Sequence, residues 1–144
     1  MKDEQARLGR RVDKLEGALY YGFYQLHRFA GITFERFVRR LLTRELVKEG
    51  VIPRGKRLRE EVVDGEQIDI FLDDPLIVGE VTAYAETEGE VDKLLKKVRV
   101  AESRYGRQAS RKILIVLAAP RGVAKRLRRR CQEEGIELIL GRTV

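Results

Sequence analysis

The sequence predicts an α/β protein in which a mixed β-sheet is flanked by helices, with a further coiled-coil-type helix at the N-terminus. Helical and strand-like periodicities alternate in the second half of the 144-residue chain, which is the pattern of parallel strands joined by helices. Residues 112–119, KILIVLAA, form the continuous apolar run of a strand buried on both faces. With 43% hydrophobic residues, the chain can build the core of a single domain.

The first expected element is a long N-terminal helix over residues 2–28. Its apolar side chains recur at three- and four-residue steps and form a narrow stripe typical of a coiled-coil seam. We expect this helix to lie outside the compact core and to pack against another helix, of the same chain or of a second copy. The sequence thus divides into residues 1–30, which would make a homodimer, and a domain of residues 31–144. The stripe consists of Leu8, Val12, Leu15, Leu19 and Leu26.

The domain of residues 31–144 begins with a second helix. Gly31 interrupts the first helix, Thr33 is a suitable N-cap for the second, and Gly50 ends it after about Glu49. The turn residues Asp73-Asp74-Pro75 separate two of the strand-like segments that follow. The remaining expected elements are strands at 57–63, 67–72 and 76–84, a helix at 88–105, a strand at 112–119, a helix at 121–135 and a strand at 136–140.

Strict alternation is expected within the strand at 67–72, since successive side chains of a strand point to opposite faces. One face would carry Ile68, Ile70 and Leu72. The other face would carry Gln67, Asp69 and Phe71.

The composition restricts the chemistry. The chain carries 30 Lys+Arg against 23 Asp+Glu, a formal net charge of +7, which indicates an anionic partner such as nucleic acid or a heat-adapted surface. A single cysteine and a single histidine argue against a disulfide framework, a cysteine-rich zinc site or a histidine relay. No apolar segment approaches the length of a membrane span or a signal core, so we expect a cytoplasmic protein without a membrane partner. Carboxylates, lysines, arginines and hydroxyls remain for any reaction.

Acidic residues are concentrated in the middle of the chain. Between 51 and 85, four bases stand against eight acids (4 − 8 = −4). A symmetric hairpin around Asp73-Asp74-Pro75 would pair residues whose numbers sum to 149, which places Asp69 opposite Glu80. Two carboxylates about 5 Å apart repel each other. A divalent cation, Mg²⁺ or Mn²⁺, would remove that conflict.

These acids also carry a resemblance to a known family. Glu35 in GITFERFVRRLL, Asp69 in QIDIFLDD and Glu80 in LIVGEVTAY resemble the PD-(D/E)XK, or restriction-endonuclease-like, superfamily. That superfamily includes archaeal Holliday-junction resolvases and small archaeal proteins with an N-terminal coiled coil. The family core is a helix, a three-stranded meander, a helix and a further strand, which is the order expected for residues 31–119.

The resemblance implies a metal-dependent deoxyribonuclease. Asp69 would be the principal ligand of Mg²⁺ (or Mn²⁺), Glu80 would complete the site and Glu35 would assist. The chain departs from the motif at Thr82, where the family has a lysine two residues after the acid. Some members carry the lysine on the following helix, so the candidate replacements are Lys93, Lys96 and Lys97.

Two basic segments are candidates for contact with DNA. One lies on the second helix and the other on the helix at 121–135, and each has a solvated helix face as the alternative interpretation. The candidate nucleic-acid-binding residues are Arg36, Arg39, Arg40, Lys125, Arg126 and Arg129. Three functions remain open: a nuclease acting on DNA, a nuclease-fold module that binds nucleic acid or mediates assembly without cleavage, and a structural or dimerisation protein.

Overall fold

The structure is a computed structural model that describes residues 15–25 and 32–144. These residues form five strands and four helices. No helix among them is both long and apolar enough to cross a membrane. The elements are η1 (Ala18–Gly22, a π-helical turn), α3 (Phe34–Lys48), β1 (Arg59–Val63), β2 (Glu66–Leu72), β3 (Ile77–Tyr84), α4 (Gly89–Tyr105), β4 (Arg111–Ala119), α5 (Arg121–Glu134) and β5 (Glu137–Thr143).

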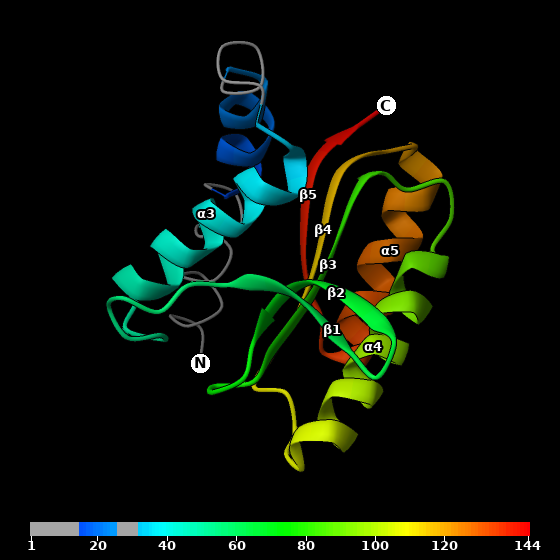
Figure 1. The fold of residues 1–144 in the computed structure, drawn as a ribbon. Coiled ribbons are helices and arrows are strands. Elements are labelled where there is room, and N and C mark those ends of the chain that lie inside the picture. The colour runs from blue at the N-terminus through cyan, green and yellow to red at the C-terminus, as the bar shows by residue number, and fades with distance from the viewer. Residues whose placement is uncertain (1–14, 26–31) are drawn as a thin grey trace, which may run out of the picture.

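The five strands form one mixed sheet in the order β1-β2-β3-β4-β5. The β1–β2 and β2–β3 pairs are antiparallel, whereas β3–β4 and β4–β5 are parallel. Parallel neighbours need a crossover connection, and α4 and α5 supply the two crossovers on one face of the sheet. Figure 1 shows α3 on the opposite face. The expectation of a mixed sheet flanked by helices is confirmed.

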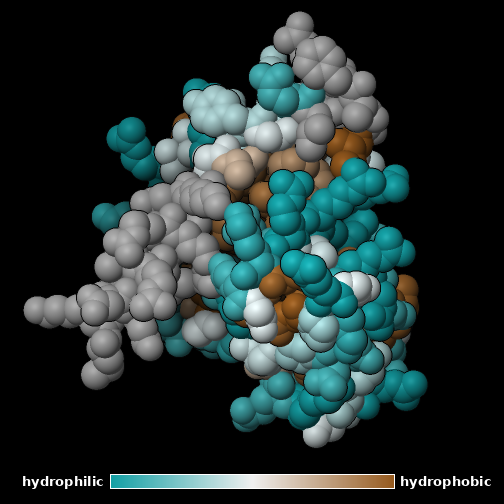
Figure 2. Space-filling view, turned by 90° about the vertical axis from the view of Figure 1, so that its left-hand side faces the viewer, coloured by the Kyte–Doolittle hydropathy of each residue, from teal (hydrophilic) through white to brown (hydrophobic). Residues whose placement is uncertain are grey.

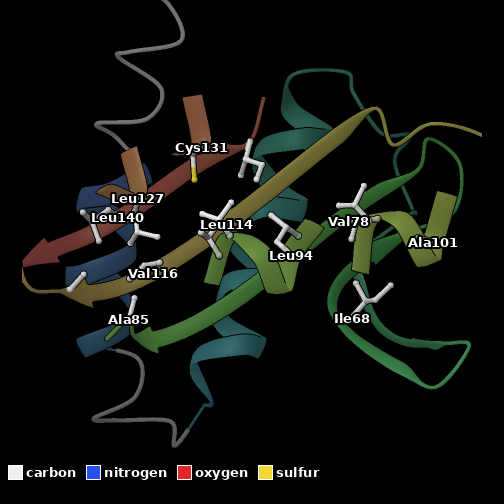
Figure 3. Packing of buried hydrophobic residues seen from close by; sticks show 14 of the residues in the cluster. Ile68, Val78, Ala85, Leu94, Ala101, Leu114, Val116, Leu127, Cys131 and Leu140 are labelled. Carbon is white, nitrogen blue, oxygen red and sulfur yellow. The ribbon is translucent and has the colours of Figure 1, made fainter. Parts of the chain in front are cut away.

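Apolar side chains fill both faces of this sheet. The crossover-side core lies under α4 and α5, and Leu94 and Leu127 from these helices meet Leu114 of β4 there (Figure 3). The α3-side core joins Phe37 and Leu42 of α3 to the sheet. Residues of β4 alternate between the two cores and are buried throughout 113–116. This double burial explains the continuous apolar sequence of β4.

Local signals set the ends of the helices as expected. The hydroxyl of Thr33 accepts a hydrogen bond from the backbone N–H of Arg36 at 3.3 Å, which caps the first turn of α3. Gly50, just past the end of α3, has a φ of +76°, a conformation that glycine adopts without strain. The predicted helix from Thr33 to about Glu49 is therefore confirmed at both ends.

The strand β2 does not keep the strict alternation expected for it. Its pairing with β1 advances two residues along β1, from Arg59 to Glu61, but three along β2, from Phe71 to Ile68. One extra residue therefore lies in β2 between Ile68 and Phe71, which is a β-bulge. As a result Ile68 and Ile70 enter opposite cores. The prediction that both share one face is wrong because the bulge shifts the alternation at Asp69.

The described part of the N-terminal helix packs on the domain itself. Leu15 and Leu19 are buried in the α3-side core. The Glu16 carboxylate accepts a hydrogen bond from the backbone N–H of Leu140 in β5, and Arg142 donates to the Tyr20 hydroxyl at 2.6 Å. For residues 15–25, the expectation of a helix outside the core is wrong, because their apolar side chains cover the sheet. Leu8, Val12 and Leu26 of the predicted stripe lie outside the described residues.

Candidate active site

Two acids lie where β2 and β3 separate. The paired residues of these strands run from Leu72 opposite Ile77 to Ile70 opposite Gly79, so the predicted sum of 149 is confirmed for them. β3 continues beyond Gly79 alongside β4. At the next position, the Oδ2 atom of Asp69 accepts a hydrogen bond from the backbone N–H of Val81 at 3.0 Å. At the bulge, the side chain of Asp69 thus accepts a hydrogen bond from a backbone N–H of β3.

Lys97 of α4 reaches the second acid, Glu80 of β3. The Lys97 Nζ atom lies 2.7 Å from Glu80 Oε2, and the two side chains are only 15% and 11% exposed. Glu80 is also the one charged residue that counts as buried in the described chain. An ion pair this short and this enclosed is a charge-assisted hydrogen bond in a medium of low polarity.

The other two candidate lysines pair elsewhere. Lys93 lies 3.2 Å from Glu90 on its own helix, and Lys96 lies 3.0 Å from Glu66 of β2. Both side chains are about two-thirds exposed, at 64% and 65%. Of the three lysines, Lys97 is therefore the one that the fold brings to the acids.

Burial dominates the electrostatics of both acids. It raises the pKa of Asp69, against the lowering effects of the Val81 N–H and of the Lys97 charge. It also raises the pKa of Glu80, against the hydrogen bond from Lys97, and the charge of Asp69 adds to that rise. The Lys97 ammonium group thus bonds Glu80 and acts on Asp69 through its charge. Two acids with raised pKa values beside one largely enclosed cation are typical of functional sites.

Glu35 lies near this pair without completing a cluster. It is half-buried at the start of α3, and its negative charge contributes to the raised pKa of Asp69. Among residues 15–25 and 32–144, no three acidic, histidine or cysteine side chains converge closely enough to hold a metal ion. The pair Asp69 and Glu80 still fits Mg²⁺, which proteins commonly bind through one or two carboxylates together with water and substrate phosphate.

Thr82 follows Glu80 by two residues, at the position where the resemblance would require a lysine. Its hydroxyl donates a hydrogen bond to the backbone carbonyl of Tyr84 at 3.2 Å. The residue therefore makes a local contact at the end of β3 and brings no charge to the site. The cation that lies beside Glu80 is that of Lys97.

The candidate nucleic-acid-binding residues fall on opposite faces of the sheet. Arg36, Arg39 and Arg40 lie on α3, while Lys125, Arg126 and Arg129 are exposed on α5. Arg126 of the second group pairs with Glu88 at 3.0 Å. The α3 group borders a hollow of about 600 Å³, called here the arginine groove, between α3 and the segment 57–60. Its arginines are Arg36, Arg39, Arg40, Arg44, Arg57 and Arg59.

Sequence reasoning missed the far wall of this groove and the backbone partner of Asp69. Arg57 and Arg59 come from a segment rich in basic residues, RGKRLR at 54–59, and that density was the available signal. The donor at Val81 has no sequence signal, because any residue supplies a backbone N–H. No protein-family model, curated protein or solved structure matches this chain.

Proposed function

We propose that this protein is a metal-dependent nuclease-like enzyme that hydrolyses phosphodiester bonds in DNA. The observation that carries the proposal is the 2.7 Å ion pair between Lys97 and Glu80, enclosed beside Asp69. Two acids from adjacent strands and a lysine from the next helix are the three functional groups that the motif requires. In this proposal the lysine is Lys97 of α4 instead of a residue two positions after the acid.

Each residue would have a distinct role. Asp69 and Glu80 would hold Mg²⁺ or Mn²⁺, which activates water and stabilises the charge that develops on phosphate. The Val81 N–H fixes the orientation of the Asp69 carboxylate through Oδ2. The Lys97 ammonium lies against Glu80 and would stabilise negative charge on the reacting phosphate. Glu35 would assist from α3.

The test is cleavage of linear, single-stranded and branched DNA with Mg²⁺, Mn²⁺ or EDTA. The variants Asp69→Asn, Glu80→Gln and Lys97→Met should lose cleavage by at least about 100-fold, the scale of a lost catalytic group. Glu86→Gln, a change at an exposed acid, is the matched control and should cleave normally. Full cleavage by Asp69→Asn and Glu80→Gln, or cleavage in EDTA, would overturn the proposal.

A second function is favoured by Thr82 and by the absence of a three-acid cluster in the described residues. In this alternative the protein keeps the nuclease-like site without turnover and binds nucleic acid or mediates assembly. It predicts salt-sensitive DNA binding with no cleavage in either Mg²⁺ or Mn²⁺. The assay above separates the two functions, since only the nuclease cleaves.

We also propose a homodimer formed through the N-terminal apolar stripe. Leu15 and Leu19 are engaged within the chain, so the contact would fall to Leu8, Val12 and Leu26. Light scattering should report a dimer for the unchanged chain and a monomer for Leu8→Lys/Val12→Lys/Leu26→Lys. A dimer that persists in this variant would exclude the stripe as the contact, and a monomeric unchanged chain would exclude the dimer.

A further inference from the structure

Three arginines form a row along the exposed face of α3. Arg36, Arg40 and Arg44 are spaced four residues apart, so they share one face of the helix and follow each other at about 6 Å. All three are exposed. Within the part of the chain that the structure describes, none has an ion-pair partner for its guanidinium group. Among the described residues, the row is therefore a line of three positive charges without an acidic partner.

The opposite wall of the arginine groove is held firmly against this row. Leu58 is buried, and its backbone N–H donates to the Thr43 hydroxyl of α3 at 3.0 Å. Arg59 pairs with Glu61 at 2.9 Å and its guanidinium lies 5.1 Å from the centre of the Phe71 ring. The groove thus has two walls joined by a hydrogen bond and by packing. Figure 2, viewed from the side of α3, shows hydrophilic residues surrounding smaller hydrophobic patches on this side of the molecule.

Arg39 connects the groove to the acids. It lines the groove, and its Nη1 atom donates to the backbone carbonyl of Asp69 at 3.0 Å. The same guanidinium lies 3.8 Å from Glu60, the single acid among the described lining residues. Arg39 thus joins the lining of the groove to the backbone of Asp69, whose carboxylate accepts a hydrogen bond from the Val81 N–H.

The charge of the groove distinguishes it from the basic face of α5. There Arg126 and Arg130 pair with Glu88 and Asp92 at 3.0 and 2.9 Å. In the groove, Arg39 and Arg59 lie 3.8 and 2.9 Å from Glu60 and Glu61, and the other four arginines have no ion-pair partner among the described residues. Guanidinium groups bind phosphate with two parallel hydrogen bonds. No aromatic side chain is among the described lining residues, so the groove offers contacts to phosphate and no surface on which bases would stack.

We infer that the arginine groove binds successive phosphates of one nucleic-acid strand, with Arg36, Arg40 and Arg44 as the contacts, and leads that strand to Asp69 and Glu80. The first half of this inference stands alone, and the second rests on the proposed nuclease function. The strand belongs either to single-stranded DNA or to a duplex, because both present the same row of phosphates. Contacts to phosphate alone imply binding without sequence preference.

The test measures binding of fluorescent single-stranded and duplex DNA at several salt concentrations in EDTA. The variant Arg36→Gln/Arg40→Gln/Arg44→Gln should lower the slope of log K against log salt by about 2.7 for a duplex or about 2.1 for a single strand, since each phosphate contact contributes about 0.9 or 0.7. The kind of DNA, single-stranded or duplex, for which the salt slope of binding falls by the expected amount is the one that the groove binds. The single change Arg40→Gln should lower the slope by about one third as much.

The matched control removes the same charge from the other face. Arg99→Gln/Arg104→Gln/Arg128→Gln changes three exposed arginines of α4 and α5, and its slope should stay within about 0.5 of the unchanged protein. The inference is overturned if the groove variant keeps the original slope, if the control loses as much, or if the unchanged protein shows no salt-dependent binding. Because binding is measured in EDTA, a protein that fails to cleave DNA can still confirm the groove. If the protein cleaves DNA but the groove variant keeps the original slope, the groove is excluded and the proposed nuclease function is not.

Discussion

The enclosed ion pair makes Lys97→Met the most informative single substitution. Methionine keeps the length of the lysine side chain but leaves the Glu80 carboxylate without its cation. Removing one partner of a buried ion pair costs about 3–5 kcal/mol. Because Lys97 and Glu80 retain 15% and 11% exposure, we expect the lower end of that range, about 3 kcal/mol. For a protein of this length, the loss corresponds to a Tm lower by about 6–12 °C.

The loss should depend on pH. Burial raises the pKa of Glu80 in the folded protein, and Lys97 opposes that rise. Removal of Lys97 therefore raises the pKa further. Since the folded protein then binds this proton more tightly than the unfolded chain, stability falls as the pH rises from the unfolded pKa through the folded one. The variant should lie close to the unchanged protein near pH 4, where Glu80 is protonated in both, and well below it near pH 7.5.

Thermal unfolding followed by circular dichroism in EDTA at these two pH values is the assay. Lys96→Met is the matched control, because its partner Glu66 forms an exposed pair with it, and it should cost less than about 1 kcal/mol. The double variant Lys97→Met/Glu80→Gln should recover most of the lost Tm at pH 7.5, since a neutral amide replaces the unpaired carboxylate. Equal Tm values for Lys97→Met and Lys96→Met at pH 7.5 would refute the reasoning.

Three further outcomes follow from local packing. Gly79→Ala should destabilise the protein by about 1–3 kcal/mol in urea unfolding, because the new Cβ would lie 3.0 Å from the Cβ of Ile70. The control is Gly122→Ala, whose new Cβ would lie 3.5 Å from its nearest neighbour and should not destabilise the protein. Burial raises the pKa of the Cys131 thiol to about 11, so iodoacetamide at about pH 8 should modify it only after unfolding; rapid labelling of the native protein would contradict this. Thr33→Ala should cost about 1 kcal/mol through the lost cap, and Thr33→Ser should restore it; equal Tm values for Thr33→Ala and the unchanged protein would show that the cap contributes nothing.

The regular elements were predictable because their apolar residues follow the helix and strand periods. The hairpin register between β2 and β3 also followed from the symmetry of a turn at Asp73-Asp74-Pro75, and the pairs 70–79 and 72–77 confirm it. The bulge at Asp69 was not predictable in this way. The apolar residues Ile68, Ile70 and Phe71 fit both a regular strand and a bulged one, so the sequence does not distinguish the two pairings with β1.

The proximity of Asp69 and Glu80 was predictable from the sequence, whereas the identity of the lysine beside them was not. Sequence placed three lysines on one helix, and only the packing of α4 on β3 selects Lys97, because Lys93 and Lys96 turn toward Glu90 and Glu66. The arginine groove could not be predicted from the sequence. Its walls are 15 residues apart along the chain at the bond between Leu58 and Thr43, and no local pattern encodes such a contact.

Because β2 contains an extra residue, the geometry around Asp69 depends on the number of residues in this strand. The halves of the strand on either side of the bulge are out of phase, so Ile68 and Ile70 supply one anchor to each core. Deletion of Asp69 would bring the halves into phase with Ile68 and Ile70 still on opposite sides of the sheet, so both cores would keep their anchors and the bulge alone would be lost. Substitutions at Asp69 can leave the bulge in place, whereas a strand shortened by this residue cannot form it. The bulge, and with it the backbone position of residue 69, therefore depends on how many residues lie between Ile68 and Phe71 and not on which side chains they carry.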